Sequence, residues 1–182
     1  MDIKKMLWEK CAEFHGHECG GLTLGYKAAL YVVELMNLQL DENGCISSDE
    51  ELVCVTENDA CSVDAIQVIL GCSAGKGNLI FHLTGKQAYT VFNRKTRESI
   101  RIVLKNRPEG LSREESFAYY QSKEPSEIFD VTPVKITLPE SAKLYESFVC
   151  SCCGETAGSN WIRFVDGKPL CLDCFAEQEE KN

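Results

Sequence analysis

Two pairs of cysteines near the end of the sequence constrain this chain more than any other feature. Each pair has the spacing Cys-x-x-Cys, Cys150 with Cys153 and Cys171 with Cys174, and residues 154–170 separate the pairs. Each tight turn offers two thiolates, and two such turns complete a tetrahedron of soft sulfur ligands around Zn²⁺. A redox pair or unrelated buried thiols are the alternative, but the spacing favours zinc. Four protein ligands leave no open position, so the expected role of this metal is structural.

The residues between the two pairs support a small zinc module. WIRFV at 161–165, the turn Asp166-Gly167 and KPL at 168–170 predict a hairpin that brings the pairs together. FAEQEEK, which follows Cys174, suits a terminal helix. This order resembles a treble-clef or zinc-ribbon module, and Cys152 is its surplus thiol. We therefore expect two domains, a core domain over residues 1–140 and a zinc-binding domain over residues 141–182.

Composition narrows the class of protein. The net charge is 19 minus 28, or −9, so broad nucleic-acid binding is not expected. The first 14 residues, MDIKKMLWEKCAEF, lack the apolar core of a signal peptide. The most hydrophobic stretch, residues 22–38, is too polar for a membrane span. The expected location is therefore the cytoplasm, with no membrane association. Eleven cysteines in a reducing compartment point to metal or thiol chemistry more than to disulfides.

The pattern of apolar residues predicts an α+β core domain with a mixed, largely antiparallel sheet flanked by helices. A polar loop is expected at 41–50, and tight turns at 84–86 and 94–97 join the strands on either side of them as hairpins. Asp59 is expected to cap the third helix and Gly71 to end it, while Ser112 and Glu115 form a capping box for the fourth. The predicted helices are 2–13, 22–38, 60–70 and 113–121, and the predicted strands are 51–56, 79–83, 88–93, 99–104 and 134–139.

FHGHECGG, residues 14–21, gathers soft metal ligands in one short stretch. His15, His17 and Cys19 alternate, so in an extended segment their side chains would share one side. Gly20 and Gly21 then let the chain turn into the next helix, whose N-terminus favours a thiolate at Cys19. Imidazole and thiolate together suit Zn²⁺ or Fe²⁺. The alternative is a polar turn whose histidines cap backbone groups.

Other residues could join or adjoin such a site. Cys61 begins the third predicted helix, where an activated thiol or a metal ligand is expected. The nearby carboxylates Glu13, Glu18 and Asp64 suit a proton acceptor or a partner of a ligand, although solvated helix charges explain each of them too. For the remaining cysteines, Cys11, Cys45 and Cys54, buried or loop thiols are a sufficient explanation, and His82 reads as a hydrogen-bonded core histidine.

GCSAGKGN, residues 71–78, resembles a phosphate loop without meeting its pattern. Three residues instead of four separate Gly71 from Gly75, Gly77 replaces Ser or Thr, and the loop follows a helix. Nucleotide hydrolysis is therefore not expected. A backbone nest that includes Cys72, Lys76 and Asn78 is a weaker candidate for binding an anion.

Taken together, these segments resemble the E-subunit family of formylmethanofuran dehydrogenase. The resemblance rests on FHGHECGGLTLGYKAA, ENDACSVDAIQVILGCSAGKGNL, GKQAYTVFNRKT and the four-cysteine tail. The family's opening motif usually reads F-H-G-H-x-C-P-G, and Gly20 stands here in place of its proline. The resemblance implies an α+β domain followed by a zinc module. It also implies a site that gathers His15, His17, Cys19, Cys61 and the 72–78 loop.

The resemblance implies a metal-binding accessory protein of a molybdenum or tungsten oxidoreductase, in the one-carbon or formate metabolism of an anaerobe. It assigns no reaction. In that role Cys19, Cys61 and His17 are the candidate reactive residues, and a second Zn²⁺ or Fe²⁺ joins the structural zinc. The alternatives are a stand-alone metal- or thiol-dependent enzyme and a zinc-stabilised interaction module without chemistry. A homodimer is expected only from the general tendency of small domains to pair.

Overall fold

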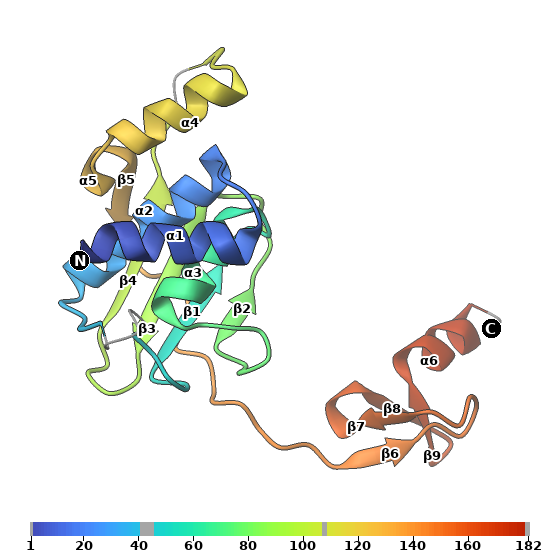
Figure 1. Ribbon diagram of the computed structural model, residues 1–182. Helices are drawn as coiled ribbons and strands as arrows, with labels where there is room; N and C mark the ends of the chain where they lie inside the picture. Colours follow the sequence, from blue (N-terminus) through green and yellow to red (C-terminus); the bar gives the residue numbers. More distant parts are fainter. Residues whose placement is uncertain (1, 41–45, 107–108, 181–182) are drawn as a thin grey trace. The chain divides into compact units, whose positions relative to one another are not determined.

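The computed structural model describes residues 2–40, 46–106 and 109–180. The chain divides into two compact units, Met1–Ala142 and Lys143–Asn182 (Figure 1). The first part of the predicted 41–50 loop and Cys45 lie outside the described residues. Among the residues that are described, no helix is both long and apolar enough to cross a membrane.

The first unit is a five-stranded sheet with helices packed on it. The strands lie in the order β2-β1-β3-β4-β5, with β1 parallel to β2 and every other neighbouring pair antiparallel. The predicted α+β class and its mixed, largely antiparallel sheet are therefore confirmed. The helices are α1 (Ile3–His15), α2 (Gly20–Leu35), α3 (Ser62–Leu70), α4 (Arg113–Ser122) and α5 (Pro125–Ile128). The strands are β1 (Leu52–Thr56), β2 (Leu79–Phe81), β3 (Ala88–Asn93), β4 (Ser99–Leu104) and β5 (Phe129–Thr132).

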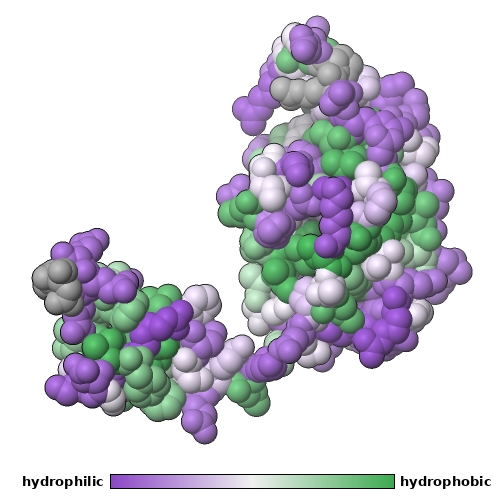
Figure 2. All heavy atoms as spheres, turned by 180° about the vertical axis from the view of Figure 1, so that it is seen from behind, coloured by the Kyte–Doolittle hydropathy of each residue, from purple (hydrophilic) through white to green (hydrophobic). Residues whose placement is uncertain are grey.

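Successive side chains of β1 point to opposite faces of the sheet and so belong to two separate apolar layers. Leu52 and Cys54 join the main core beneath α1, α2 and α3, which lie on one face of the sheet (Figure 1). Val53 and Val55 point to the other face and form a smaller cluster with Phe92. Seen from behind, with α1 turned away, the first unit shows apolar surface in its middle, bordered by hydrophilic side chains (Figure 2).

The predicted strand over 134–139 is wrong. The fifth strand is β5, which pairs with β4 from Arg101 opposite Thr132 to Leu104 opposite Phe129. Pro133 follows directly and has no N–H to continue the ladder. Val134 and Leu138 instead pack against the smaller apolar cluster. Their period-two spacing therefore reflects burial on the second face of the sheet without strand pairing.

The predicted hairpin at residues 84–86 is also wrong, because β2 and β3 lie on opposite sides of β1. The connection from β1 through α3 to β2 makes a parallel pair, and β3 then returns antiparallel to β1. The N–H groups of Thr84 and Gly85 donate to the Glu57 carbonyl, so this turn wraps around the end of β1. The turn at 94–97 does join two antiparallel neighbours, β3 and β4, as predicted.

Helix boundaries follow local signals with one exception. The capping box of Ser112 and Glu115 at α4 is confirmed, and Gly71 ends α3 in the left-handed conformation with φ 69°. Asp59 does not cap α3, because the residue before the helix is Cys61. The Asn58 side chain organises this turn instead by accepting hydrogen bonds from Ala60 N–H and the Ser62 hydroxyl.

The second unit consists of two short hairpins and a helix. β6 (Ser147–Val149) pairs with β7 (Thr156–Gly158), and a 3₁₀ turn (Ser159–Trp161) leads to the second hairpin. In that hairpin β8 (Ile162–Val165) and β9 (Lys168–Cys171) are joined by Asp166 (φ 49°) and Gly167 (φ 74°). Positive φ at both turn residues matches the twist of paired strands. The predicted hairpin and the terminal helix, α6 (Leu172–Glu179), are confirmed.

Candidate metal centres

The four cysteines of the second unit form one cluster. The sulfur atoms of Cys150, Cys153, Cys171 and Cys174 all lie within 4.8 Å of one another. Metal–sulfur bonds of about 2.3 Å place the ligands of a tetrahedral zinc about 3.8 Å apart, so small inward movements would close the site. Cys152 is exposed and does not belong to the cluster. The donor set fits Zn²⁺, and the cluster is consistent with a zinc module.

Backbone groups prepare this cluster for a cation. The N–H of Cys171 donates to Cys150 Sγ at 3.4 Å, while Ser151 N–H reaches the Pro169 carbonyl at 2.8 Å and ties the two turns together. Hydrogen bonds from backbone N–H groups, that of Cys171 foremost, lower the pKa of Cys150 to about 6. The pKa of Cys174 is instead raised, chiefly by its contact with the Cys171 thiol. Four crowded thiols therefore resist full ionisation unless a cation neutralises them.

A second cluster lies in the first unit, where His15, His17 and Cys19 each offer one ligand atom and these atoms lie within 4.8 Å of one another. The segment is not extended at His15, which is the last residue of α1. Gly16 follows with φ 85° and turns the chain, so the expected role of Gly20 and Gly21 in the turn is wrong. Both of those glycines already belong to α2.

His15 links the cluster to α3. Its Nδ1 lies 2.6 Å from Asp64 Oδ2, and its Nε2 faces Cys19 Sγ at 3.7 Å. Because a carboxylate accepts hydrogen bonds, Nδ1 is the nitrogen that donates to Asp64, and Nε2 is the nitrogen that faces Cys19. Gln67 Nε2 donates to the other Asp64 oxygen at 3.3 Å and holds that carboxylate. This carboxylate–histidine arrangement is the usual support of a metal-binding imidazole.

Cys19 occupies the N-cap of α2, as the sequence predicted. Its Sγ accepts a hydrogen bond from Leu22 N–H at 3.3 Å, and the side chain is buried. His17 is exposed, and its ring centroid lies 4.5 Å from that of His15. Of the nearby carboxylates, Glu18 accepts from the Trp8 indole at 2.9 Å and Asp64 supports His15. The cluster therefore combines one buried thiol with two imidazoles.

Cys61 adjoins this cluster from the start of α3. A Cβ placed on Gly21 would lie 3.6 Å from Cys61 Sγ and 3.9 Å from Cys19 Sγ, so the absent side chain leaves room for both thiols. Burial and the neighbouring Cys19 thiol raise the pKa of Cys61. This direction opposes the expected activation of Cys61 by the helix N-terminus. A bound cation would supply the missing stabilisation of the thiolate.

A small cavity opens beside Cys19. Its volume is about 190 Å³, and Glu18, Cys19 and Gly20 form one wall. The other wall comes from α4, with Arg113, Glu114 and Phe117. Sequence reasoning missed this contribution, because α4 is far from the cluster along the chain and carries no local signal of it. The cavity gives the cluster access to a small molecule.

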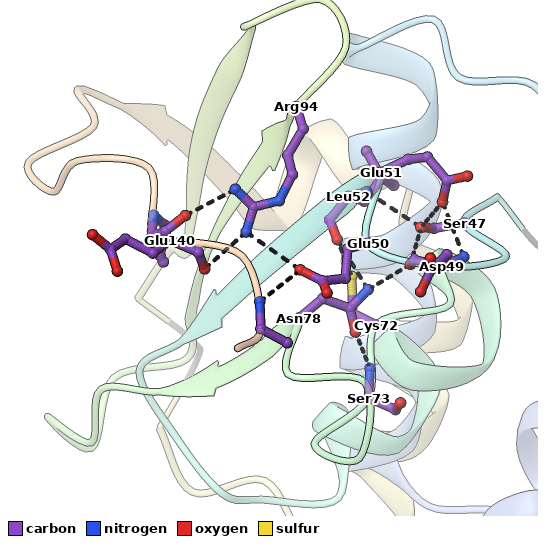
Figure 3. A network of polar contacts seen from close by, with 12 residues as sticks. Ser47, Asp49, Glu50, Glu51, Leu52, Cys72, Ser73, Asn78, Arg94 and Glu140 are labelled. Carbon is purple, nitrogen blue, oxygen red and sulfur yellow. Dashed lines mark hydrogen bonds and ion pairs between the residues drawn. The ribbon is translucent and has the colours of Figure 1, made fainter. Parts of the chain in front are cut away.

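The loop from Cys72 to Asn78 lies at the opposite end of α3 from Cys61, so the structure does not bring it to the cluster. The Asn78 amide donates to the carbonyls of Asp49 and Leu52 and accepts from Ser73 N–H (Figure 3). Lys76 Nζ lies 3.3 Å from the Ser47 carbonyl. An anion at this loop would compete with these contacts, and its binding stays a prediction.

Two other sequence interpretations concern isolated residues. Cys11 and Cys54 are buried, as expected of ordinary core thiols, and Cys72 of the 72–78 loop is buried as well. His82 is not a core histidine, because β2 ends at Phe81 and leaves the imidazole exposed. The apolar neighbours of His82 predict a strand that continues past Phe81, which the structure does not have.

Comparisons with known proteins identify relatives of the chain. The family model described as "FmdE, Molybdenum formylmethanofuran dehydrogenase operon" matches residues 14–133. A curated relative from Archaeoglobus fulgidus, named "Probable S-adenosyl-L-methionine-binding protein", is 28% identical in an alignment that covers 91% of this chain and 51% of that protein. The chain thus spans about half the length of this relative.

A solved structure has the same fold. It is the crystal structure of an FmdE-like protein of the tungsten formylmethanofuran dehydrogenase type, from Syntrophus aciditrophicus. It superposes with a TM-score of 0.69 at 24% sequence identity and covers 96% of this chain and 92% of its own. At this identity the likeness supports the fold alone. The match spans both the sheet unit and the cysteine-rich unit.

Proposed function

The chain belongs to the FmdE family, and from that membership we propose that it is a metal-binding accessory protein of a molybdenum or tungsten oxidoreductase. The proposed setting is one-carbon or formate metabolism in the cytoplasm of an anaerobe. Support for the partner comes from the description of the family model. The four-cysteine unit would be a structural zinc module that docks partners, and a second copy of the chain is a further candidate partner.

The metal proposal for the first unit rests on one observation, the alignment of Asp64, His15 and Cys19. Asp64 fixes the imidazole so that Nε2 and Cys19 Sγ face each other at 3.7 Å, close to the spacing of two ligands on one tetrahedral ion. His17 supplies a third donor within 4.8 Å. Cys61 lies outside this group of three but adjoins Cys19, and it would be the fourth donor. We propose that these residues hold Zn²⁺ or Fe²⁺.

A second candidate function is a stand-alone metal-dependent enzyme, favoured by the cavity beside Cys19. A metal held by three protein ligands keeps an open position and can activate water or a thiol. In that case Cys19, Cys61 and His17 would be the reactive set, and Arg113 and Phe117 would contact the substrate. If Cys61 completes four ligands instead, the site is closed and the accessory role is favoured.

A metal count tests the proposed site. Protein purified without oxygen is expected to carry two metal ions per chain, and the Cys19→Ser/Cys61→Ser double variant is expected to carry one. The matched control is Cys11→Ser/Cys54→Ser, which changes two buried thiols outside the cluster and should retain both metals. One metal per chain in the wild type, unchanged in the double variant, would refute a tightly held metal in the first unit.

A single substitution tests the supporting role of Asp64. Asp64→Asn retains the shape of the side chain but weakens its hold on His15 Nδ1–H, so metal affinity is expected to fall about 10- to 100-fold. The control is Glu13→Gln, which likewise replaces a carboxylate by a carboxamide but at an exposed position on α1. Competition with a chromophoric chelator measures both affinities. Equal affinities in the two variants would contradict the proposed arrangement.

Two measurements separate the accessory role from the enzyme. Co-purification with a molybdenum- or tungsten-containing catalytic subunit supports the accessory role, and its absence from anaerobic extracts counts against it. In protein loaded with Co²⁺, azide is expected to change the visible spectrum only if the metal has an open position. An unchanged spectrum would exclude the three-ligand enzyme, and Cys61→Ser should then create a response.

A further inference from the structure

A second polar cavity lies on the face of the sheet that α1, α2 and α3 leave uncovered. Its volume is about 150 Å³. Glu57 follows the last residue of β1 and His82 follows the last residue of β2, the one parallel pair in the described sheet. Crevices beyond the carboxyl ends of parallel strands are the usual position for ligand binding in such sheets. The polar side chains of the lining are Glu57, His82, Thr84, Lys86, Thr90, Arg101 and Lys135.

Glu57 and Arg101 form an ion pair in this cavity, so their opposite charges balance each other. Arg101 Nε and Nη2 both lie 2.7 Å from Glu57 Oε1, and the Thr84 hydroxyl donates to Oε2 at 3.0 Å. Burial acts to raise the pKa of Glu57, but the hydrogen bonds from Arg101 and Thr84 outweigh it and the pKa is lowered. Glu57 is therefore a carboxylate whose charge Arg101 balances. It leaves little negative charge to attract a cation.

The remaining groups of the lining are positive or neutral donors. Lys86 lies 4.0 Å from the Glu57 carboxylate, which Arg101 already satisfies. Within the described part of the chain, no partner is found for the side chains of His82, Thr90 and Lys135. The lining thus carries three cations against one carboxylate, in a chain whose net charge is −9. A local excess of positive charge in a concave site concentrates anions.

From this arrangement we infer that the cavity binds a compact oxyanion, a phosphate or a small carboxylate. Lys86 and Lys135 supply the charge, and the Thr90 hydroxyl and the His82 imidazole supply directed hydrogen bonds. Val55 and Ile136 form apolar walls that exclude water from one side of the anion. The cavity size limits the ligand to a few heavy atoms beyond the oxyanion. None of the lining residues belongs to either candidate metal cluster, and the inference does not depend on the proposed metal.

Titration calorimetry at low ionic strength tests this inference, with inorganic phosphate in one arm and acetate in the other. One saturable event per chain is expected for at least one of the two anions. The Lys86→Ala/Lys135→Ala double variant should bind that anion at least tenfold more weakly. The control, Lys5→Ala/Lys168→Ala, removes the same charge from exposed positions outside the cavity and should leave binding unchanged.

A third variant separates this site from the proposed metal centre. Anion binding is expected to persist in Cys19→Ser/Cys61→Ser, because neither thiol lines the cavity. Binding that disappears in this variant would assign the anion to the metal and overturn the inference. So would the absence of saturable binding of both anions, or equal losses in the two lysine double variants. Thr90→Val, which keeps the side-chain shape, should weaken binding without a change in net charge.

Discussion

Gly25 is the position where one added methyl group should test both the fold and the site. A Cβ built on Gly25 would lie 1.9 Å from the Ser62 carbonyl oxygen and 2.6 Å from its carbonyl carbon. These are backbone atoms of α3, so no side chain can rotate away. To reach an ordinary contact of 3.4 Å, α2 and α3 must separate by roughly 1.5 Å, the difference between 3.4 and 1.9. Gly25→Ala forces that separation.

The expected loss of stability combines two opposing contributions. Overpacking a close contact costs typically about 1–3 kcal/mol, and a backbone obstruction belongs at the upper end. Replacing glycine by alanine inside a helix recovers about 1 kcal/mol. The net loss is therefore about 2 kcal/mol, or a decrease of roughly 4–8 °C in Tm for a domain of this size. Thermal denaturation followed by circular dichroism measures it.

Gly20→Ala is the matched control on the same helix. Its Cβ would meet Ser116 Oγ at 3.4 Å and no backbone atom closer than 3.5 Å, so Tm should change little. A second measurement tests the site, because Cys61 directly precedes Ser62 and moves with α3. Gly25→Ala is therefore expected to weaken metal binding, whereas Gly20→Ala is not. If the Gly25→Ala and Gly20→Ala variants have the same Tm, the close approach of the two helices is refuted.

Three further predictions follow from local contacts. Hydrogen bonds, first of all from backbone N–H groups, hold the pKa of Glu51 at about 2. This lies below its unfolded value of about 4.3, so the stability that Glu51 supplies is complete above about pH 5 and is lost as the pH falls from about 4.3 to about 2. Urea titrations of Glu51→Gln should show a weaker pH dependence in that window, and a parallel acid branch would contradict this. Gly20→Pro should raise the free energy of unfolding by about 0.4–1 kcal/mol. Gly20 is the first residue of α2, where proline is favoured, and the preceding residue, Cys19, is extended (φ −156°, ψ 165°), as a residue before proline should be. An unchanged or lower free energy of unfolding in chemical denaturation would disprove this prediction. Cys174→Ser should abolish one bound metal and expose the second unit to proteolysis, whereas Cys152→Ser should do neither, and equal digestion of the two variants would argue against a structural metal.

The elements that could be predicted from the sequence are those whose signals are local. The capping box at Ser112 and the turn at Asp166-Gly167 each depend on residues within a few positions, and both occur as predicted. The apolar stripe of α2 is similarly self-contained. Strand pairing is different, because the turn at residues 84–86 has hairpin chemistry while β2 pairs with β1. The preference of β1 for partners on both sides is a tertiary property that no short window contains.

Burial without pairing explains the other error of the strand prediction. Val134 and Leu138 alternate as a strand would, yet their alternation only covers Val53 and Val55 on the second face of the sheet. Arg94 then fixes the following segment by donating to the carbonyls of Pro139 and Glu140 (Figure 3). An arginine that binds two carbonyls replaces the ladder that was expected. The sequence carries no local sign of this anchor.

The metal-binding side chains of the candidate site could be predicted because His15, His17 and Cys19 lie close together in the sequence. The residues that adjoin or position them, Cys61 and Asp64, come from α3. Asp64 reaches His15 from α3 across to the end of α1, and Cys61 reaches Cys19 where α2 and α3 approach each other closely. The approach of α2 and α3 does leave a trace in the sequence. Gly21 and Gly25 are one helical turn apart and therefore share a face of α2. A Cβ on the first would meet Cys61, and one on the second would meet Ser62. Two glycines at this spacing in an otherwise apolar helix thus mark where another backbone must pass, and the start of α3 is what passes there. It carries Cys61 to Cys19 and, three residues on, Asp64 to His15.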